Sequence, residues 1–183
     1  MKTIKRKLGI VTTFVLALVA VANAQVTKEQ QSALTPDKVL ADLMDGNARY
    51  VAGKISDPEI KKRITNSADG QYPKAVVLSC LDSRVPVELV FDQGIGDIFV
   101  GRVAGNIEDE DQLGSMEFAT KLAGAKLVFV LGHSACGAVK GACDGRSLGT
   151  SRLCSPASNR RWMLCLASNL GNAPLQTKSL WKR

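Results

Sequence analysis

The sequence has no acidic residue at either end. Residues 1–24 contain four basic residues and residues 146–183 contain seven, but neither segment contains an aspartate or a glutamate. All 17 acidic residues lie in residues 25–145, where they outnumber 13 basic residues and leave a net charge of −4. A formal charge of +7 and an isoelectric point near 9.3 would ordinarily suggest a nucleic-acid partner. Because the basic charge is confined to the ends, we expect no nucleic-acid-binding domain.

The sequence also lacks long hydrophobic runs beyond its first 24 residues. The one such run, Leu8–Ala22, follows the basic stretch Met1–Lys7 and leads into Ala22-Asn23-Ala24. About 15 apolar residues are fewer than the ~20 that a membrane-spanning helix needs, so an uncleaved membrane anchor is the less favoured alternative. The pattern predicts a secretory signal peptide that is cleaved after Ala24. We therefore expect a periplasmic or secreted protein that has no membrane attachment after cleavage.

The chain contains a single histidine, His133, and this argues against two kinds of hydrolase. Ser134 and Cys136 lie close to it in sequence, but Cys136 stands where the nucleophile elbow of a serine hydrolase needs glycine. His133 would also have to act as general base for its own neighbour, which is poor geometry for a catalytic triad. We therefore expect neither a Ser–His nor a Cys–His hydrolase.

The middle of the chain alternates between helical and strand-like segments. Thr35 followed by Pro36 suits the start of a helix that runs to about Tyr50, and Ile55–Ile64 is a second, short helical or irregular piece. This order predicts an α/β domain with a mostly parallel β-sheet flanked by helices. The predicted strands are Ala75–Ser79, Asp97–Val103 and Lys126–Gly132, with a helix at Glu110–Leu122 before the last of them.

Chemically active residues follow the first and the third predicted strands. Cys80 and Asp82 come after the first, and His133 and Cys136 come after the third. Functional residues collect beyond the carboxyl ends of parallel strands, so neighbouring strands would bring two thiolates and one imidazole together. That set suits tetrahedral Zn²⁺ and leaves a fourth position for water. A Cys80–Cys136 disulfide, in a redox or structural protein, is the alternative in an oxidising compartment, although the total of five cysteines prevents full pairing.

Three segments around these residues resemble the β-class carbonic anhydrases. Cys80–Pro86 (CLDSRVP) and Gly132–Gly137 (GHSACG) match the two signature segments of that family, and Gly96–Asn106 (GDIFVGRVAGN) is similar to the strand and turn between them. The resemblance covers residues 35–145. It implies reversible hydration of carbon dioxide to bicarbonate and a proton, with zinc hydroxide as the nucleophile, in a homodimer or a higher homo-oligomer.

The resemblance also implies roles for individual residues of the metal site. Cys80, His133 and Cys136 would bind one Zn²⁺ per chain. In the active state Asp82 would pair with Arg84 and accept a hydrogen bond from zinc-bound water, whereas in a closed state Asp82 would itself be the fourth zinc ligand. Because the chain has no second histidine, a proton would leave through buffer or through a group that the sequence does not identify.

Three further residues match family positions that line the carbon dioxide pocket: Gln71, Phe99 and Gly137. For Phe99, packing in the hydrophobic core explains the residue type equally well.

Residues 146–183 do not continue the pattern of the preceding domain. They contain no acidic residue, and Ser147–Arg161 shows neither helical nor strand periodicity. Reading the back-translated sequence from Arg146 in another frame can give a helical, family-like string, so we hypothesise a one-nucleotide frameshift near Asp144–Arg146. A further helix, a further parallel strand and a C-terminal helical region, which the family has beyond this point, would then be missing.

We therefore expect three parts: a signal peptide at 1–24, a β-carbonic anhydrase-like α/β domain at 25–145 that is incomplete at its C-terminus, and an aberrant basic tail at 146–183 outside the fold. The alternative to an active enzyme is an inactive truncated fragment that binds zinc without catalytic activity.

Overall fold

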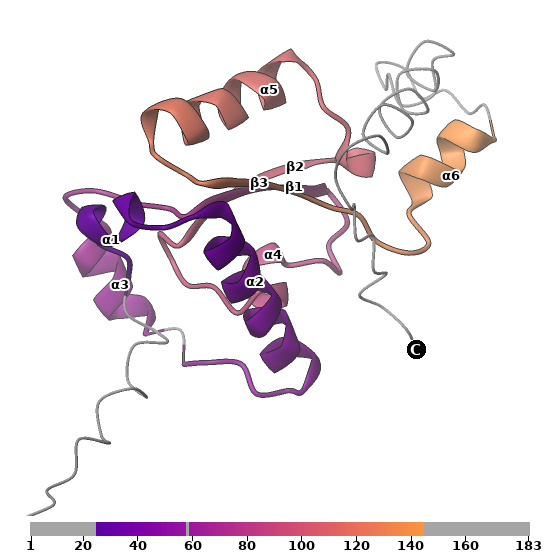
Figure 1. The fold of residues 1–183 in the computed structure, drawn as a ribbon. Helices are drawn as coiled ribbons and strands as arrows, with labels where there is room; N and C mark the ends of the chain where they lie inside the picture. Colours follow the sequence, from indigo (N-terminus) through magenta and orange to yellow (C-terminus); the bar gives the residue numbers. More distant parts are fainter. Residues whose placement is uncertain (1–24, 58, 145–183) are drawn as a thin grey trace, which may run out of the picture.

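The computed structural model describes residues 25–57 and 59–144 (Figure 1). The predicted signal peptide and the predicted tail lie outside the described residues, so the three-part division and the frameshift stay predictions. The described elements follow the chain in the order α1 (Lys28–Ser32), α2 (Pro36–Val51), α3 (Ile60–Ser67), β1 (Ala75–Cys80), α4 (Val87–Val90), β2 (Ile98–Val103), a 3₁₀ turn η1 (Ala104–Asn106), α5 (Glu110–Glu117), a π-helical turn η2 (Phe118–Leu122), β3 (Leu127–Leu131) and α6 (Gly137–Cys143).

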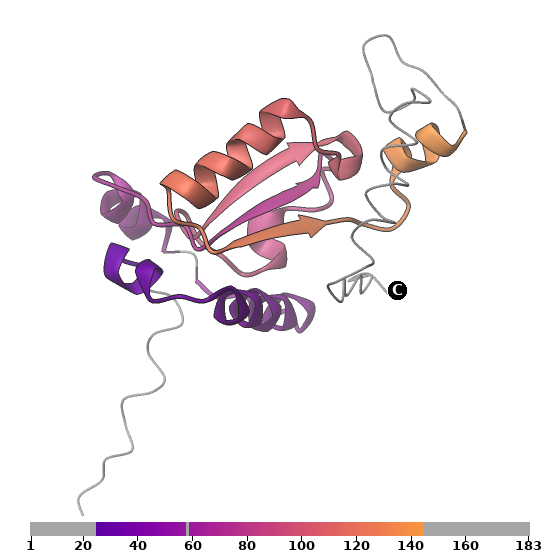
Figure 2. The same ribbon diagram turned by 45° about the horizontal axis from the view of Figure 1, so that its top comes forward.

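The three strands form one parallel sheet, as the sequence predicts. Their order is β2-β1-β3, and Ala75 of β1 lies opposite Ile98 of β2 and Leu127 of β3 (Figure 2). All six residues of β1 are buried because the strand has a neighbour on each side and helices on each face. The carboxyl ends of all three strands therefore point to the same edge of the sheet.

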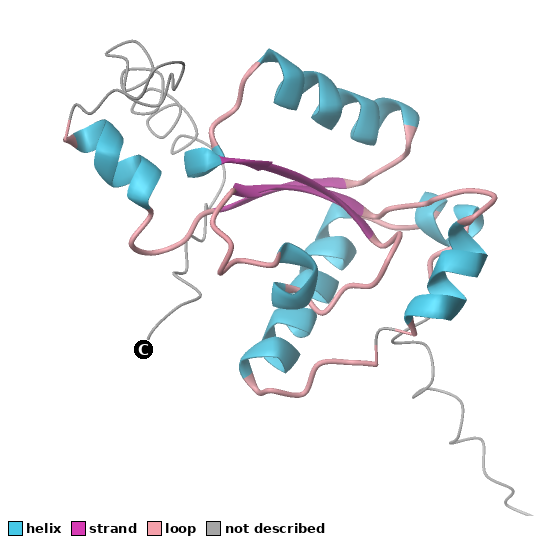
Figure 3. Cartoon of the chain, turned by 180° about the vertical axis from the view of Figure 1, so that it is seen from behind, coloured by secondary structure: helices cyan, strands magenta, loops and turns pink. Residues whose placement is uncertain are grey.

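Helices cover the two faces of the sheet unequally. Figures 1 and 3 show α2 and α4 on one face and α5 on the other. Side chains of a strand alternate between the faces, so Val77 packs with α2 and α4, whereas Val76 packs with Ala119 of η2. The larger core is on the α2 face, and its buried members are Val39, Leu43, Ala75, Val77, Val85, Val87, Val90, Phe91 and Leu131.

The predicted elements are present with small shifts at their ends. The side chain of Thr35 accepts a hydrogen bond from the backbone N–H of Lys38, so it caps α2 and places Pro36 at the first helical position. The short piece predicted at Ile55–Ile64 becomes α3, which begins only at Ile60. The helix predicted at Glu110–Leu122 continues from α5 into the π-helical turn η2.

Strand β3 is an edge of the sheet within the described residues. Its Val128 and Val130 are 44% and 55% exposed, and they lie on the same face of the sheet as Val76, where α5 and η2 do not cover β3. An apolar edge strand of this kind offers unpaired backbone groups to another chain.

The described part of the chain contains no helix that is long and apolar enough to cross a membrane.

Candidate metal centre

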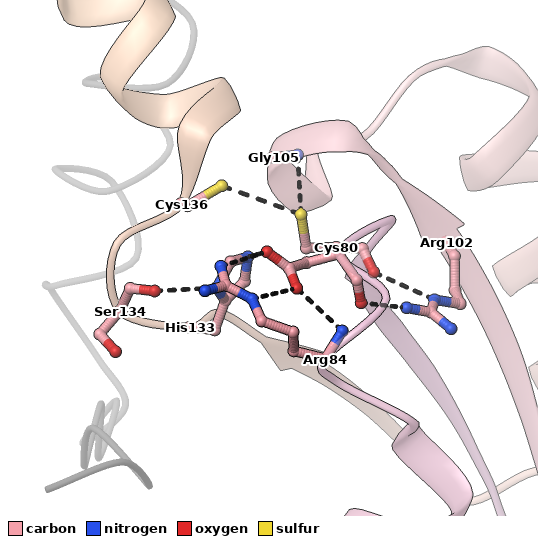
Figure 4. Close-up of polar contacts among 8 residues, drawn as sticks. Cys80, Arg84, Arg102, Gly105, His133, Ser134 and Cys136 are labelled. Atoms are coloured by element: carbon pink, nitrogen blue, oxygen red, sulfur yellow. Dashed lines mark hydrogen bonds and ion pairs between the residues drawn. The ribbon is translucent and has the colours of Figure 1, made fainter. Parts of the chain in front are cut away.

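Two parallel strands bring the predicted metal ligands together. Cys80 is the last residue of β1, and His133 and Cys136 lie in the loop between β3 and α6. Since β1 and β3 are paired directly, this loop lies beside the end of β1 (Figure 4). One ligand atom from each of the three residues lies within 4.8 Å of the other two.

The spacing of the two sulfur atoms suits a metal ion. Cys80 Sγ and Cys136 Sγ are 3.8 Å apart, and both thiols are free. Two thiolates at the usual Zn–S distance of about 2.3 Å and a tetrahedral angle would be separated by about 3.8 Å. A disulfide needs about 2.05 Å, roughly half of the separation found. The geometry therefore favours a shared metal ion over the alternative of a Cys80–Cys136 disulfide.

His133 has one ring nitrogen that is available to bind a metal ion. Nδ1 of His133 lies 2.9 Å from the carbonyl oxygen of Ser134, so a proton on Nδ1 is donated to that carbonyl. The remaining nitrogen, Nε2, is buried and has no hydrogen-bond partner among the described residues. Metal-bound histidines show this arrangement, in which a hydrogen bond at one ring nitrogen orients the other towards the metal. The donor set thus fits a divalent zinc ion.

Unusual backbone conformations shape the loops that carry the ligands. Ala135, between His133 and Cys136, has a φ of 54°, in the left-handed region that a residue with a Cβ adopts at a cost of about 1 kcal/mol or more. Gly105, in η1, has a φ of 77° and is buried, and its N–H donates to Cys80 Sγ over 3.3 Å. One bend therefore lies between two of the predicted ligands, and the other places a backbone N–H on the thiol of Cys80.

Hydrogen bonds favour the thiolate form of Cys80. Burial raises the pKa of this thiol, but the N–H groups of Asp82 and Gly105, together with the side chains of His133 and Cys136, outweigh burial and lower the pKa to about 7. A thiol must lose its proton to bind a metal. The surroundings of Cys80 therefore favour metal binding at neutral pH.

Asp82 and Arg84 form an ion pair beside the three ligands. Arg84 Nε and its backbone N–H each donate to Oδ1 of Asp82 over 2.9 Å, and Nη2 donates to Oδ2 over 2.7 Å. The hydrogen bonds from the Arg84 side chain hold the pKa of Asp82 well below its usual range. The same carboxylate lies 3.7 Å from Nε2 of His133, so it faces the metal site as an anion.

The residues predicted to line a carbon dioxide pocket lie in different places. Gly137 begins α6 directly after Cys136 and is exposed. Phe99 lies on β2, where it stacks edge-on against Phe118 at 6.4 Å and packs with the smaller core cluster. Gln71 is exposed in the loop that precedes β1, at the opposite end of that strand from Cys80. Within this single chain only Gly137 adjoins the metal ligands, and the three assignments stay predictions.

Two residues that contact the site have no signal in the sequence pattern. The guanidinium of Arg102 donates to the carbonyl oxygens of Cys80 and Asp82, and the N–H of Gly105 donates to Cys80 Sγ. They lie 20 to 25 residues from their partners in the chain. Only the pairing of β1 with β2 brings them to the site, which is why spacing could not identify them.

Comparisons with known proteins agree with this geometry. The sequence model of the carbonic anhydrase family matches residues 75–163. Carbonic anhydrase 2 of Mycobacterium tuberculosis is 45% identical over 109 residues, which are 59% of this chain and 53% of that protein. The carbonic anhydrase of Mycolicibacterium smegmatis is 50% identical over 100 residues, 54% of this chain and 48% of that protein. The chain thus spans about half the length of the curated relatives it matches.

A solved structure extends the similarity to the fold. The crystal structure of a β-carbonic anhydrase from Aspergillus fumigatus superposes with a TM-score of 0.51 and 25% sequence identity, covering 73% of this chain and 64% of that one. The aligned region thus combines the parallel sheet with a Cys-His-Cys group at its carboxyl edge. Sequence relatives, fold and donor set thus agree, and over the aligned region the chain is similar to the β-class carbonic anhydrases.

Proposed function

We propose that this protein binds one Zn²⁺ per chain through Cys80, His133 and Cys136 and catalyses the reversible hydration of carbon dioxide to bicarbonate and a proton. The observation that carries the proposal is the convergence of two sulfur atoms and one imidazole nitrogen within 4.8 Å. The names of the relatives support the choice of reaction. Three protein ligands leave one tetrahedral position open, which is typical of catalytic zinc sites.

The zinc ion would supply Lewis acidity, lowering the pKa of a coordinated water molecule towards 7. The chain's own residues would orient and charge the site around it. Asp82 is held as an acceptor by Arg84, which donates to both of its carboxylate oxygens, and one of these oxygens lies 3.7 Å from His133 Nε2. An anionic Asp82 would accept a hydrogen bond from a ligand in the open position and so orient it towards carbon dioxide. Release of the proton would depend on buffer or an unidentified group, since His133 is the only histidine in the sequence.

The test measures zinc content and carbon dioxide hydration on the same purified sample of the full chain. Cys80→Ser removes one sulfur ligand, and Cys154→Ser makes the same chemical change in the predicted tail. We expect about one zinc per chain and catalysed hydration for the wild-type protein and for Cys154→Ser, and loss of both for Cys80→Ser. Hydration that persists in the zinc-free Cys80→Ser variant would contradict the proposed site.

The second candidate function is zinc binding without catalysis, and one observation favours it. Within the described residues β3 is an apolar edge strand, exposed at Val128 and Val130. Zinc at one equivalent per chain with no acceleration of hydration would support this candidate and refute the enzymatic one. Zinc together with turnover would exclude it.

We also propose that the protein is exported and that its signal peptide is removed after Ala24. The basic start, apolar run and small residues of segment 1–24 support this location in the periplasm or outside the cell. Mass spectrometry of the exported protein should find Gln25 as its first residue. A first residue upstream of Leu8, in a membrane fraction, would instead indicate an uncleaved anchor.

Association into a homodimer or a higher homo-oligomer is part of the proposal. Large apolar side chains are exposed on α5, η2 and β3, namely Leu113, Phe118, Leu122, Val128 and Val130. A monomer in sedimentation-equilibrium measurements at micromolar concentration would contradict it.

A further inference from the structure

Arg102 joins strand β2 to the loop that carries a metal ligand. Its Nε donates to the carbonyl oxygen of Cys80 over 3.1 Å, and its Nη2 donates to that of Asp82 over 2.5 Å (Figure 4). The two carbonyl groups flank Leu81, immediately after β1 ends. One planar guanidinium therefore fixes the position of Cys80 relative to that of Asp82.

Few other contacts restrain Leu81, which lies between these two carbonyl groups. Leu81 is 64% exposed, so apolar packing holds it weakly. Its N–H donates to the carbonyl oxygen of Val103 over 3.2 Å, which continues the pairing of β1 with β2 by one residue. Beyond that residue the backbone pairing of the two strands stops, because η1 turns the chain away after Val103. Arg102 therefore connects the loop after β1 to strand β2 beyond the point where the backbone hydrogen bonds between the two strands end.

The carbonyl of Asp82 is a second point of restraint. It also accepts a hydrogen bond from the N–H of Val85 over 3.1 Å, which closes a turn around Ser83 and Arg84. Holding this carbonyl therefore holds the turn on which the Asp82–Arg84 ion pair is built. A metal site needs its ligands placed to within about 0.5 Å, and surface loops do not reach that accuracy without such supports.

We propose that Arg102 is a positioning residue of the metal centre, fixing the sulfur of Cys80 and the carboxylate of Asp82 relative to each other through their backbone carbonyls. The part of this inference that concerns metal binding rests on the proposed function. The restraint on the loop does not, because it exists in the metal-free chain. Arg102 acts through the backbone, whereas Arg84 contacts the carboxylate directly.

Substitutions at Arg102 separate the forked geometry from the charge. Arg102→Ala removes both hydrogen bonds, while Arg102→Lys keeps the charge but cannot reproduce the fork that spans two carbonyl groups. Residues that orient metal ligands in this indirect way typically contribute 10- to 100-fold to metal affinity. We expect zinc to leave the Arg102→Ala protein for a chelator at least 10-fold faster than it leaves the wild type, with Arg102→Lys between them.

Arg49→Ala is the matched control. Arg49 also bonds a partner far along the chain, since its Nε donates to Asp92 over 2.5 Å, but it joins α2 to the segment after α4 rather than to the metal loop. We expect this variant to unfold at a lower urea concentration and to release zinc at the wild-type rate. Equal zinc release by wild type and Arg102→Ala, or release that follows the loss of stability equally in Arg102→Ala and Arg49→Ala, would overturn the proposal.

A measurement without metal separates the failure of this inference from failure of the proposed function. Cys80 is only 4% exposed, so its alkylation in the metal-free protein reports opening of the loop. Followed by peptide mass spectrometry, Cys80 should be alkylated several-fold faster in Arg102→Ala than in wild type or Arg49→Ala. Unchanged alkylation in Arg102→Ala would refute the positioning role even if the wild type bound no zinc, a result that would itself refute the proposed function.

Discussion

Two helix glycines predict opposite effects of the same substitution. Gly46 lies inside α2, where a Cβ atom would come to 1.9 Å from the carbonyl oxygen of Phe91 and 2.7 Å from its carbonyl carbon. Gly114 lies inside α5, where a Cβ atom would have no neighbour within 4 Å. We therefore expect Gly46→Ala to destabilise the fold and Gly114→Ala to stabilise it.

The magnitude follows from the contact and from helix propensity. Either alanine gains about 1 kcal/mol over glycine in a helix interior. At Gly46 the two backbones must separate by more than 1 Å, since Cβ atoms essentially never approach another heavy atom closer than 3.0 Å. Overpacking of a core typically costs 1–3 kcal/mol, and the upper end applies because the obstacle is backbone. The net loss for Gly46→Ala is about 2 kcal/mol, against a gain of about 0.5–1 kcal/mol for Gly114→Ala.

Urea unfolding followed by far-ultraviolet circular dichroism measures both changes on the same chain. Gly46→Ala should lower the midpoint and Gly114→Ala should raise it, with similar slopes if both act on the folded state. A midpoint for Gly46→Ala at or above that of the wild type would refute the close packing of α2 against the end of α4.

Three further predictions follow from buried or paired polar groups. In Asp92, burial raises the pKa but Arg49 and a neighbouring serine lower it further, so its ionised form stabilises the fold above about pH 4 and that contribution is lost as the pH falls through the depressed pKa. Asp92→Asn should therefore lower the free energy of unfolding at pH 7 and weaken its decrease towards pH 3, as urea titrations at several pH values would measure; an unchanged pH dependence would contradict this. In the metal-free chain, thiolate absorbance near 240 nm should include a titration near pH 7 that Cys80→Ser removes, rather than only titrations near the ordinary value of about 8.5. Gln31→Leu removes donors at 2.7 and 2.9 Å from two backbone carbonyls and should cost about 2 kcal/mol in urea unfolding, and a cost near zero would show that water replaces them.

The strands were predictable because their signal is local. Ala75–Ser79 and Lys126–Gly132 are apolar runs bounded by polar residues, and the structure places β1 and β3 there within one residue at each end. Pro36 marked the start of α2 equally well, since its fixed φ suits only the first turn of a helix. The start of α3 was harder to predict, because Ser56 and Asp57 are capping residue types, yet the helix begins only at Ile60, after Glu59, which has a φ of 42° and makes no side-chain cap.

The three metal ligands could be identified from the sequence, but their proximity in space depends on the order of the strands in the sheet. Cys80, His133 and Cys136 stand directly after apolar runs, where parallel strands expose functional residues. Their convergence requires that β1 be paired with β3, and nothing in the spacing dictates the order β2-β1-β3. For Phe99 the sequence left a substrate contact and core packing both open; the side chain packs against Phe118, and the substrate contact stays a prediction.

The amino-acid sequence alone therefore predicted the helices and strands, the three ligand residues and the resemblance to the carbonic anhydrases. Each of these depends on neighbours a few residues apart, through helix capping, strand alternation and short motifs. Tertiary structure added the 3.8 Å separation of the two sulfur atoms, the hydrogen bond from Gly105 to one of them and the contacts of Arg102. These join residues 20 to 56 positions apart, and such distances are set by how strands pair and pack rather than by any local preference of the chain.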